Sequence, residues 1–159
     1  MPVSFAPIIN LDTRILVIGT MPSIASLEAQ EYYAYKHNSF WRIIAQAAKI
    51  DRFDSYSHKI STLQKLNLGL WDNLKYCERI GSLDSNIKNE YPNDFENLLN
   101  QYDNVQKLLF NGQKSFQFFQ KYHKELLKKY QYTVLPSTSP ANASIPYEQK
   151  LKLWLQAIK

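Results

Sequence analysis

Four short runs of mainly apolar residues recur along the chain, and each predicts a buried strand. The first, RILVIGT, has a continuously apolar and β-branched centre, which is typical of a strand covered on both faces. Gly19 and Gly112 stand where the first and third runs end. The four runs are residues 14–20, 68–72, 105–112 and 132–136.

Between these runs, apolar residues recur at intervals of three and four, which predicts helices. The segment 77–92 is polar and is predicted to be a loop. Strands that alternate with helices predict an α/β fold, here a three-layer sandwich with a four-stranded parallel sheet flanked by helices. The predicted helices begin at Ser39 and near Ser144 or Ile145, and span residues 56–66, 94–102 and 113–130.

Length and composition indicate the number of domains and the cellular environment of this fold. At 159 residues and 18.6 kDa, with 45% hydrophobic residues, the chain predicts one domain over residues 1–159. Its N-terminus lacks the pattern of a signal peptide, and no apolar stretch approaches the ~20 residues of a membrane span. The single cysteine, Cys77, excludes an internal disulfide and a cysteine-based metal site. We expect a cytoplasmic protein with a monomer as the default state, and the sequence implies no metal and no organic cofactor.

The loops that follow the four strands are the predicted location of a functional site. Parallel sheets bind ligands at the carboxyl ends of their strands, which here are Gly19, Trp71, Asn111 and Leu135. The phosphate-binding patterns GxGxxG and GxxxxGK[ST] and the nucleophile pattern GxSxG are all missing from the sequence. Nucleotide cofactors and serine-hydrolase chemistry therefore have no support.

These loops are rich in small polar and aromatic residues instead. They carry the sequences GTMPS at 19–23, YY at 32–33, NSFW at 38–41 and PSTSPAN at 136–142. Aromatic faces and amides suit a flat heterocycle, and hydroxyls with backbone N–H groups suit a phosphate. The net charge of +5 permits a polyanionic partner without requiring one. Taken alone, the last loop is also consistent with an ordinary proline-rich turn before a helix.

In combination, GTMPS, YY-x4-N-x-F-W and LPSTSPAN resemble the uracil-DNA glycosylase superfamily, most closely its hypoxanthine-DNA glycosylase branch. The resemblance extends from Arg14 to the last helix. It implies the four-stranded sheet already predicted, and hydrolysis of the N-glycosidic bond of a deaminated base in DNA, hypoxanthine above all. The substrate base must be flipped out of the stack to be reached.

The resemblance also implies roles for individual residues. Many relatives hold the attacking water with an Asp or Asn at the position of Met21, a side chain that cannot do so. In the branch with this loop the task falls to Asn38, the predicted catalytic residue. The matched base-binding residues are Gly19, Thr20, Met21, Pro22, Tyr33 and Asp72, and the residues matched to the loop that enters the duplex are Ser137, Thr138, Ser139, Pro140, Ala141 and Asn142.

Each of the main assignments has a structural alternative. Asn38 or Ser39 fits a helix N-cap, and Tyr33 fits the core. Asp72 fits a structural hydrogen bond, and Asn111, before Gly112, fits a turn residue.

Three other functions stay open at this point. The base removed could be uracil or another deaminated base. The chain could be a DNA-binding module without catalysis, which the methionine in the first loop favours. It could also hydrolyse a small nucleoside. No lysine falls on a matched catalytic position, so base removal without strand cutting is predicted.

Overall fold

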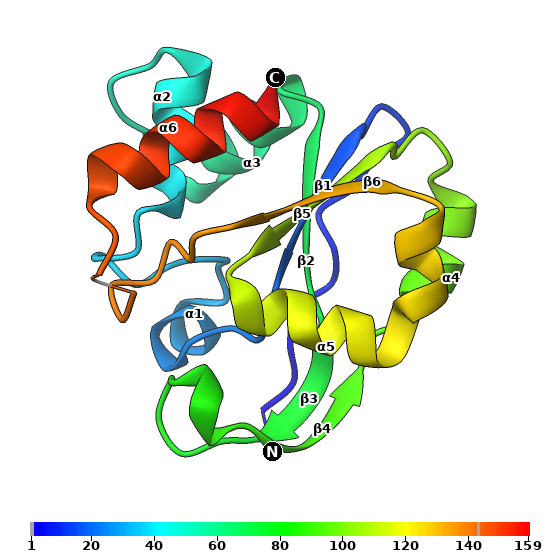
Figure 1. Ribbon diagram of the computed structural model, residues 1–159. Coiled ribbons are helices and arrows are strands. Elements are labelled where there is room, and N and C mark those ends of the chain that lie inside the picture. Colours follow the sequence, from blue (N-terminus) through cyan, green and yellow to red (C-terminus); the bar gives the residue numbers. More distant parts are fainter. Residues whose placement is uncertain (1, 143) are drawn as a thin grey trace.

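A four-stranded parallel sheet lies at the centre of the computed structural model, which describes residues 2–142 and 144–159 (Figure 1). The strand order is β2–β1–β5–β6. Gly19 pairs with Asp72, and Asn111 pairs with Leu135, so the carboxyl ends of all four strands meet at one edge. This confirms the predicted sheet. The strands are β1 Ile15–Gly19, β2 Leu68–Asp72, β5 Lys107–Asn111 and β6 Gln131–Leu135.

Helices cover both faces of the sheet, which completes the predicted three layers (Figure 1). Side chains alternate between the faces: Val17 and Leu109 pack with α2, α3 and α6, whereas Leu16 and Phe110 pack with α4 and α5. The helices are α2 Phe40–Ala48, α3 Tyr56–Lys65 and α6 Tyr147–Ile158 on one face, and α4 Phe95–Gln101 and α5 Gln113–His123 on the other.

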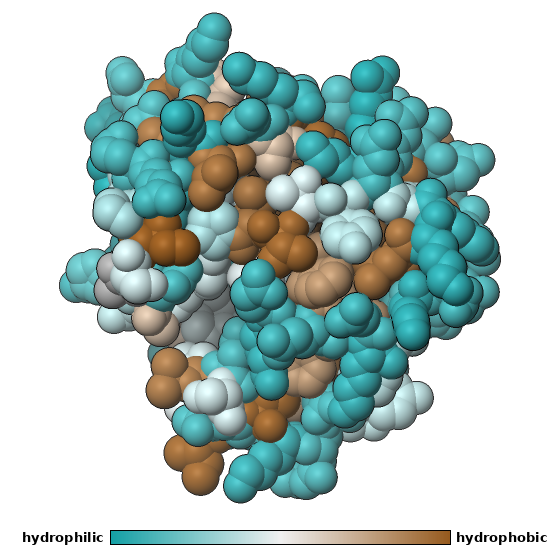
Figure 2. Space-filling model, in the orientation of Figure 1, coloured by the Kyte–Doolittle hydropathy of each residue, from teal (hydrophilic) through white to brown (hydrophobic). Residues whose placement is uncertain are grey.

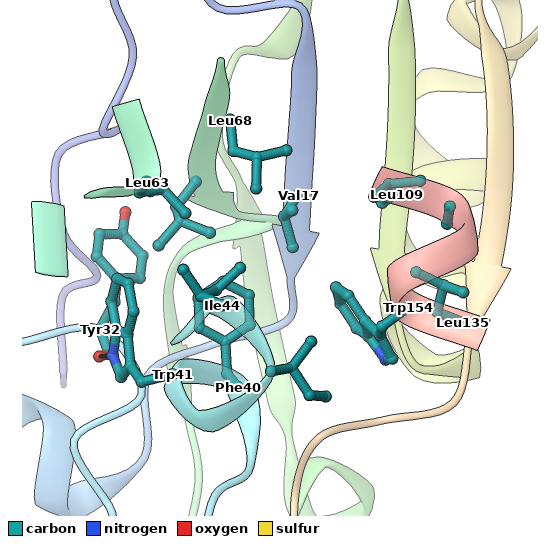
Figure 3. Packing of buried hydrophobic residues seen from close by; sticks show 13 residues of the cluster. Val17, Tyr32, Phe40, Trp41, Ile44, Leu63, Leu68, Leu109, Leu135 and Trp154 are labelled. Atoms are coloured by element: carbon teal, nitrogen blue, oxygen red, sulfur yellow. Dashed lines mark hydrogen bonds between the residues drawn. The ribbon is translucent and has the colours of Figure 1, made fainter. Parts of the chain in front are cut away.

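Large aromatic side chains fill the layer between the sheet and α2, α3 and α6 (Figure 3). Phe40 contacts Trp41 and Trp154 edge to face, with ring centroids 4.9 and 6.0 Å apart. Each indole N–H donates to a backbone carbonyl, Trp41 to Tyr32 (2.7 Å) and Trp154 to Pro136 (2.9 Å). The core thereby holds two of the segments that follow the strand ends.

The polar segment predicted as a loop at 77–92 holds the end of one strand and the whole of another, so this prediction is wrong. β3 (Leu74–Glu78) and β4 (Lys88–Pro92) form an antiparallel hairpin, with the short 3₁₀ helix η1 (Asp84–Asn86) between them. Tyr76 and Tyr91 stack across the pair with centroids 5.0 Å apart. The strand β4, with sequence KNEYP, is largely exposed and has no apolar alternation from which a strand could be predicted.

Three helices also differ from the prediction. A short helix, α1 (Ile24–Ala29), follows the first strand and is an addition to the predicted helices. The last helix begins at Tyr147, with Pro146 as its N-cap, rather than near Ser144 or Ile145. The basic helix α5 ends at His123 and continues as a 3₁₀ helix, η2 (Lys124–Lys128). Within residues 2–142 and 144–159, no helix has the length and apolar character needed to cross a bilayer.

A buried amide fixes the carboxyl end of the central strand β1. The Nδ2 of Asn73 donates to the carbonyl of Gly19 (2.9 Å) and to the carbonyl and hydroxyl of Ser115 (2.8 and 3.0 Å). The Ser115 hydroxyl donates in turn to the carbonyl of Ile18 (2.6 Å). Asn73 and Ser115 are both buried, so this network joins β1, β2 and α5 at the edge where the strands end.

We expect Asn73→Ala to destabilise the fold by about 2 kcal/mol or more, because it leaves buried polar groups with fewer partners. The shift in the urea midpoint measures this loss. Asn97→Ala, on the exposed side of α4, is the matched control and should change the midpoint little. Equal midpoints for the two variants would contradict a structural role for Asn73.

Candidate active site

A cavity of about 430 Å³ opens at the edge where the four strands end. Its lining comes from the loop after β1, the segment before α2, the loop after β6, and the hairpin loop, which is residues 79–86 between β3 and β4. Every residue predicted for the site contributes to the lining except Asn142, whose N–H instead donates to the carbonyl of Ser139 (3.1 Å). The sequence motifs that predict the site therefore come together around one cavity. The predicted residues in the lining are Gly19, Thr20, Met21, Pro22, Tyr33, Asn38, Asp72, Ser137, Thr138, Ser139, Pro140 and Ala141.

Gly19 allows two polar side chains to reach the strand end. A methyl group at this position would overlap a carboxylate oxygen of Asp72 and would lie 2.8 Å from the hydroxyl of Tyr33. Only a residue without a side chain leaves room for both groups. The glycine of GTMPS is thus required by the close approach of Asp72 and Tyr33.

Tyr33 belongs to the core and to the cavity at once. Its backbone has φ 53°, the left-handed conformation, and its ring stacks on Phe40 with centroids 4.3 Å apart and an interplanar angle of 29°. Its hydroxyl lies beside Asn111, and burial raises its pKa above the ordinary value. One ring face is covered by Phe40, so only the other face is available to a ligand.

Asn38 likewise combines a local structural contact with a place on the cavity wall. Its Oδ1 accepts a hydrogen bond from the N–H of Phe40 (2.9 Å), which closes a turn at the start of α2. The N-cap of α2 is Ser39, whose N–H and hydroxyl both donate to the carbonyl of Thr138 (3.0 and 3.2 Å). Asn38 is half-buried, and its Nδ2 has no hydrogen-bond partner among the described residues.

Asn111 positions the loop that follows β6. Its Nδ2 donates to the hydroxyl of Thr138 (3.0 Å), and its Oδ1 accepts from the N–H of Thr138 (2.9 Å). The helix α6 holds the same loop from the other side, through Trp154 and through Lys150, whose Nζ donates to the carbonyl of Ser139 (3.4 Å). Asn111 is therefore more than a turn residue, because it joins two loops that are distant in the sequence.

Two carboxyl groups line the cavity. Burial raises the pKa of Asp72 to about 7; the charge of Asp84 adds to this effect and that of Arg79 opposes it. Burial also raises the pKa of Asp84, against a hydrogen bond from Thr20 and the charges of Arg79 and Lys114. Asp84 is not among the residues predicted for the site, because it lies in the polar segment 77–92, which carries no structural signal.

The hairpin loop encloses one side of the cavity. Arg79 donates through Nη2 to the carbonyl of Pro22, and the hydroxyl of Ser82 accepts from the N–H of Ile24 (2.9 Å). Leu83 and Asp84 follow directly and line the cavity. Within the described part of the chain, no three His, Cys, Asp or Glu residues are grouped so that they could hold a metal ion.

The chain belongs to the uracil DNA glycosylase superfamily, whose family model matches residues 6–158. A hypoxanthine DNA glycosylase from Methanosarcina acetivorans is 36% identical over 141 residues, which cover 87% of this chain and 86% of the relative. A hypoxanthine DNA glycosylase from Methanosarcina barkeri is 32% identical, covering 98% and 96%. The solution NMR structure of a candidate uracil DNA glycosylase from Methanosarcina acetivorans superposes with a TM-score of 0.83, at 31% identity, over 98% of this chain and 95% of the other.

The raised pKa of Asp72 predicts a pH-dependent stability. Between pH 4 and about 7 the folded protein keeps a proton on Asp72 that the unfolded chain has lost, so its contribution to stability falls as the pH rises and is constant above that window. Asp72→Asn removes the contribution. The free energy of unfolding of the variant, relative to the unmodified protein, should rise across the window by at most about 1.4 kcal/mol per pH unit.

Urea unfolding at pH 5, 6, 7 and 8 measures this difference. Asp103→Asn changes an exposed carboxyl and is the control, for which the difference should stay flat. A flat difference for Asp72→Asn as well would contradict the raised pKa.

Proposed function

We propose that this protein is a monofunctional DNA glycosylase that hydrolyses the N-glycosidic bond of a flipped-out deaminated base, above all hypoxanthine. The observation that carries the proposal is the cavity at the sheet edge, which Asn38 and Tyr33 both line, in a member of the superfamily. The chain is about one third identical, over most of its length, to two proteins named hypoxanthine DNA glycosylase. Cytoplasmic location and a monomeric state stay predictions.

The cavity suits a planar base in size and in lining. Its volume of about 430 Å³ is in the range of sites that enclose small ligands, about 300–1,000 Å³. The free face of Tyr33 supplies an aromatic surface on which a base can stack. Met21 also lines the cavity and adds an apolar side chain, which is buried in a cluster with Leu74, Cys77 and Phe118. Flipping a base into this cavity costs a few kcal/mol, which is least for a damaged or mispaired base.

The carboxyl groups of Asp72 and Asp84 complement the edge of hypoxanthine. This base presents an N–H donor next to a carbonyl acceptor. A carboxylate accepts from the N–H, and a protonated carboxyl donates to the carbonyl. Because the pKa of Asp72 is raised to about 7, both forms are populated near neutral pH. Backbone N–H groups at Thr20 and Met21 are further donors for the carbonyl.

Asn38 is the residue that places the attacking water. Bond cleavage leaves positive charge on the sugar and negative charge on the departing base. The Oδ1 of Asn38 orients a water molecule toward the anomeric carbon, and the donors around the base stabilise its negative charge. An amide does not titrate, so the chemical step should depend weakly on pH near neutrality, and any pH dependence should fall on base binding through Asp72.

The loop of residues 136–142 contacts the DNA backbone at the mouth of the cavity. Ser137 and Ser139 offer hydroxyls to the phosphates, and Pro140 and Ala141 line the cavity as small, stiff residues. The buried bonds of Thr138 hold this loop in place before DNA arrives. Binding through phosphates should weaken with salt.

The function is tested with an oligonucleotide panel that contains inosine, uracil, xanthine or a G·T mismatch, in single and double strands. We expect the inosine strand to become cleavable by alkali most rapidly and to stay intact without alkali. No lysine is present among the described residues that line the cavity, so strand cutting through a Schiff base has no candidate there.

Each other result of the panel has a defined meaning. Binding of damaged DNA that leaves every strand alkali-resistant would replace the proposal with a DNA-binding module. Faster release of uracil than of hypoxanthine would change the proposed substrate base but would keep the proposed class, a DNA glycosylase. Activity on free deoxyinosine alone would indicate a nucleoside hydrolase. Binding that does not change with salt would count against a DNA substrate.

The role of Asn38 is tested by two substitutions that separate chemistry from helix capping. Asn38→Ala removes both the amide and the turn acceptor, whereas Asn38→Ser keeps a hydroxyl that can accept from the N–H of Phe40. Under single-turnover conditions, both variants should lose at least about 100-fold in the rate of base release. The thermal midpoint of Asn38→Ser should stay near that of the unmodified protein. Full activity of Asn38→Ser would show that Asn38 only shapes the turn.

A further inference from the structure

Exposed apolar side chains gather at the mouth of the cavity. Ile24, Tyr35 and Leu83 line it and are nevertheless 47%, 43% and 53% exposed. Ile80, three residues before Leu83 in the hairpin loop, is 89% exposed. Figure 2 shows hydrophobic atoms at the lower left edge of the molecule, where α1 and the hairpin loop lie in Figure 1. Apolar surface beside a ligand cavity is typical of an interaction site.

The loop that carries Ile80 and Leu83 is held firmly against the protein. Besides the bonds of Arg79 and Ser82 to the segment after β1, the loop has internal hydrogen bonds. Asn86 donates through Nδ2 to the carbonyl of Ile80 (3.1 Å) and through its N–H to the carbonyl of Leu83 (3.0 Å). The exposed apolar side chains are thus presented from a fixed backbone.

The charges of this loop are turned toward the protein. Arg79 and Asp84 are the charged residues between positions 79 and 86. Arg79 donates to the carbonyl of Pro22, and Asp84 lines the cavity. The loop therefore offers apolar side chains to its surroundings, which suits the bases of a nucleic acid better than its phosphates.

From the loop after β6, the residues Pro140 and Ala141 line the cavity, and both are small. A duplex that has lost one nucleotide from its stack contains a gap, and proteins that open the stack commonly insert large apolar side chains at such places. Ile80 and Leu83 have the required size and exposure.

We propose that the hairpin loop, residues 79–86, is a second DNA-contacting element that packs Ile80 and Leu83 against the base stack beside the extruded nucleotide. This inference rests on the proposed function. The hairpin loop would then act beside the loop of residues 136–142, which is matched to the loop that enters the duplex, and would stabilise the opened stack.

The test compares one inosine strand in duplex and in single-stranded form, under single-turnover conditions. In the duplex the base must leave the stack, and in the single strand this cost is largely absent. The variant Ile80→Ala with Leu83→Ala should lose about tenfold or more on the duplex and stay within about twofold on the single strand, since a few kcal/mol of unstacking is at stake. Ile80→Leu with Leu83→Met keeps large apolar side chains and should retain the duplex rate.

Leu153→Ala, on the exposed face of α6, is the matched control and should change neither rate. An unchanged duplex rate for the double alanine variant, or an equal loss on both forms of the strand, would overturn the inference. If the unmodified protein releases no base from either form, the proposed function fails instead. If the unmodified protein cleaves the duplex but not the single strand, the fluorescence of a 2-aminopurine next to the inosine replaces the single strand as readout. Equal unstacking by the unmodified protein and by the double alanine variant would then overturn the inference.

Discussion

The site depends above all on the buried hydrogen bonds of Thr138. Its N–H and hydroxyl bond to Asn111 at the end of β5, and its carbonyl accepts from the N–H and hydroxyl of Ser39 at the start of α2. Thr138 is 1% exposed, so water cannot replace these partners. Breaking a buried bond of this kind costs about 1–3 kcal/mol. Asn38 and Ser137, each adjacent to a residue of this network, take their positions from it.

A second set of hydrogen bonds, buried at Asn73 and Ser115 and exposed at Ser82, fixes the end of β1 and the hairpin loop. Asn73 and Ser115 hold the end of β1, and Arg79 and Ser82 attach the hairpin loop to the segment that follows it. The second set holds the carbonyl of Gly19, whose missing side chain admits Asp72 and Tyr33. A group that orients a water molecule must be held in place before the substrate arrives. A cavity whose lining segments are fixed by hydrogen bonds provides this preorganisation.

The sequence predicts the sheet and most of the site for a physical reason. A parallel strand buried on both faces must be apolar throughout, as in β1, and its carboxyl end must be followed by a loop at the ligand edge. The motifs on these loops could therefore be placed together without a structure. The hairpin could not, because a polar strand such as β4 stays exposed and leaves no periodicity. Asn111 and Thr138 lie 27 residues apart, and nothing local predicts that they pair.

The acidic lining of the cavity is compatible with a polyanionic substrate because charge and base recognition are separated in space. Under the proposed function, the flipped base is uncharged and enters the cavity, whereas the phosphates stay outside at the loops. Burial raises the pKa of Asp72 to about 7, so near neutral pH Asp72 opposes the DNA with less negative charge than an ordinary carboxylate would. The net charge of +5, spread over the rest of the surface, attracts the duplex at longer range. Carboxyl groups that would repel DNA on the surface can therefore read a base once they are buried.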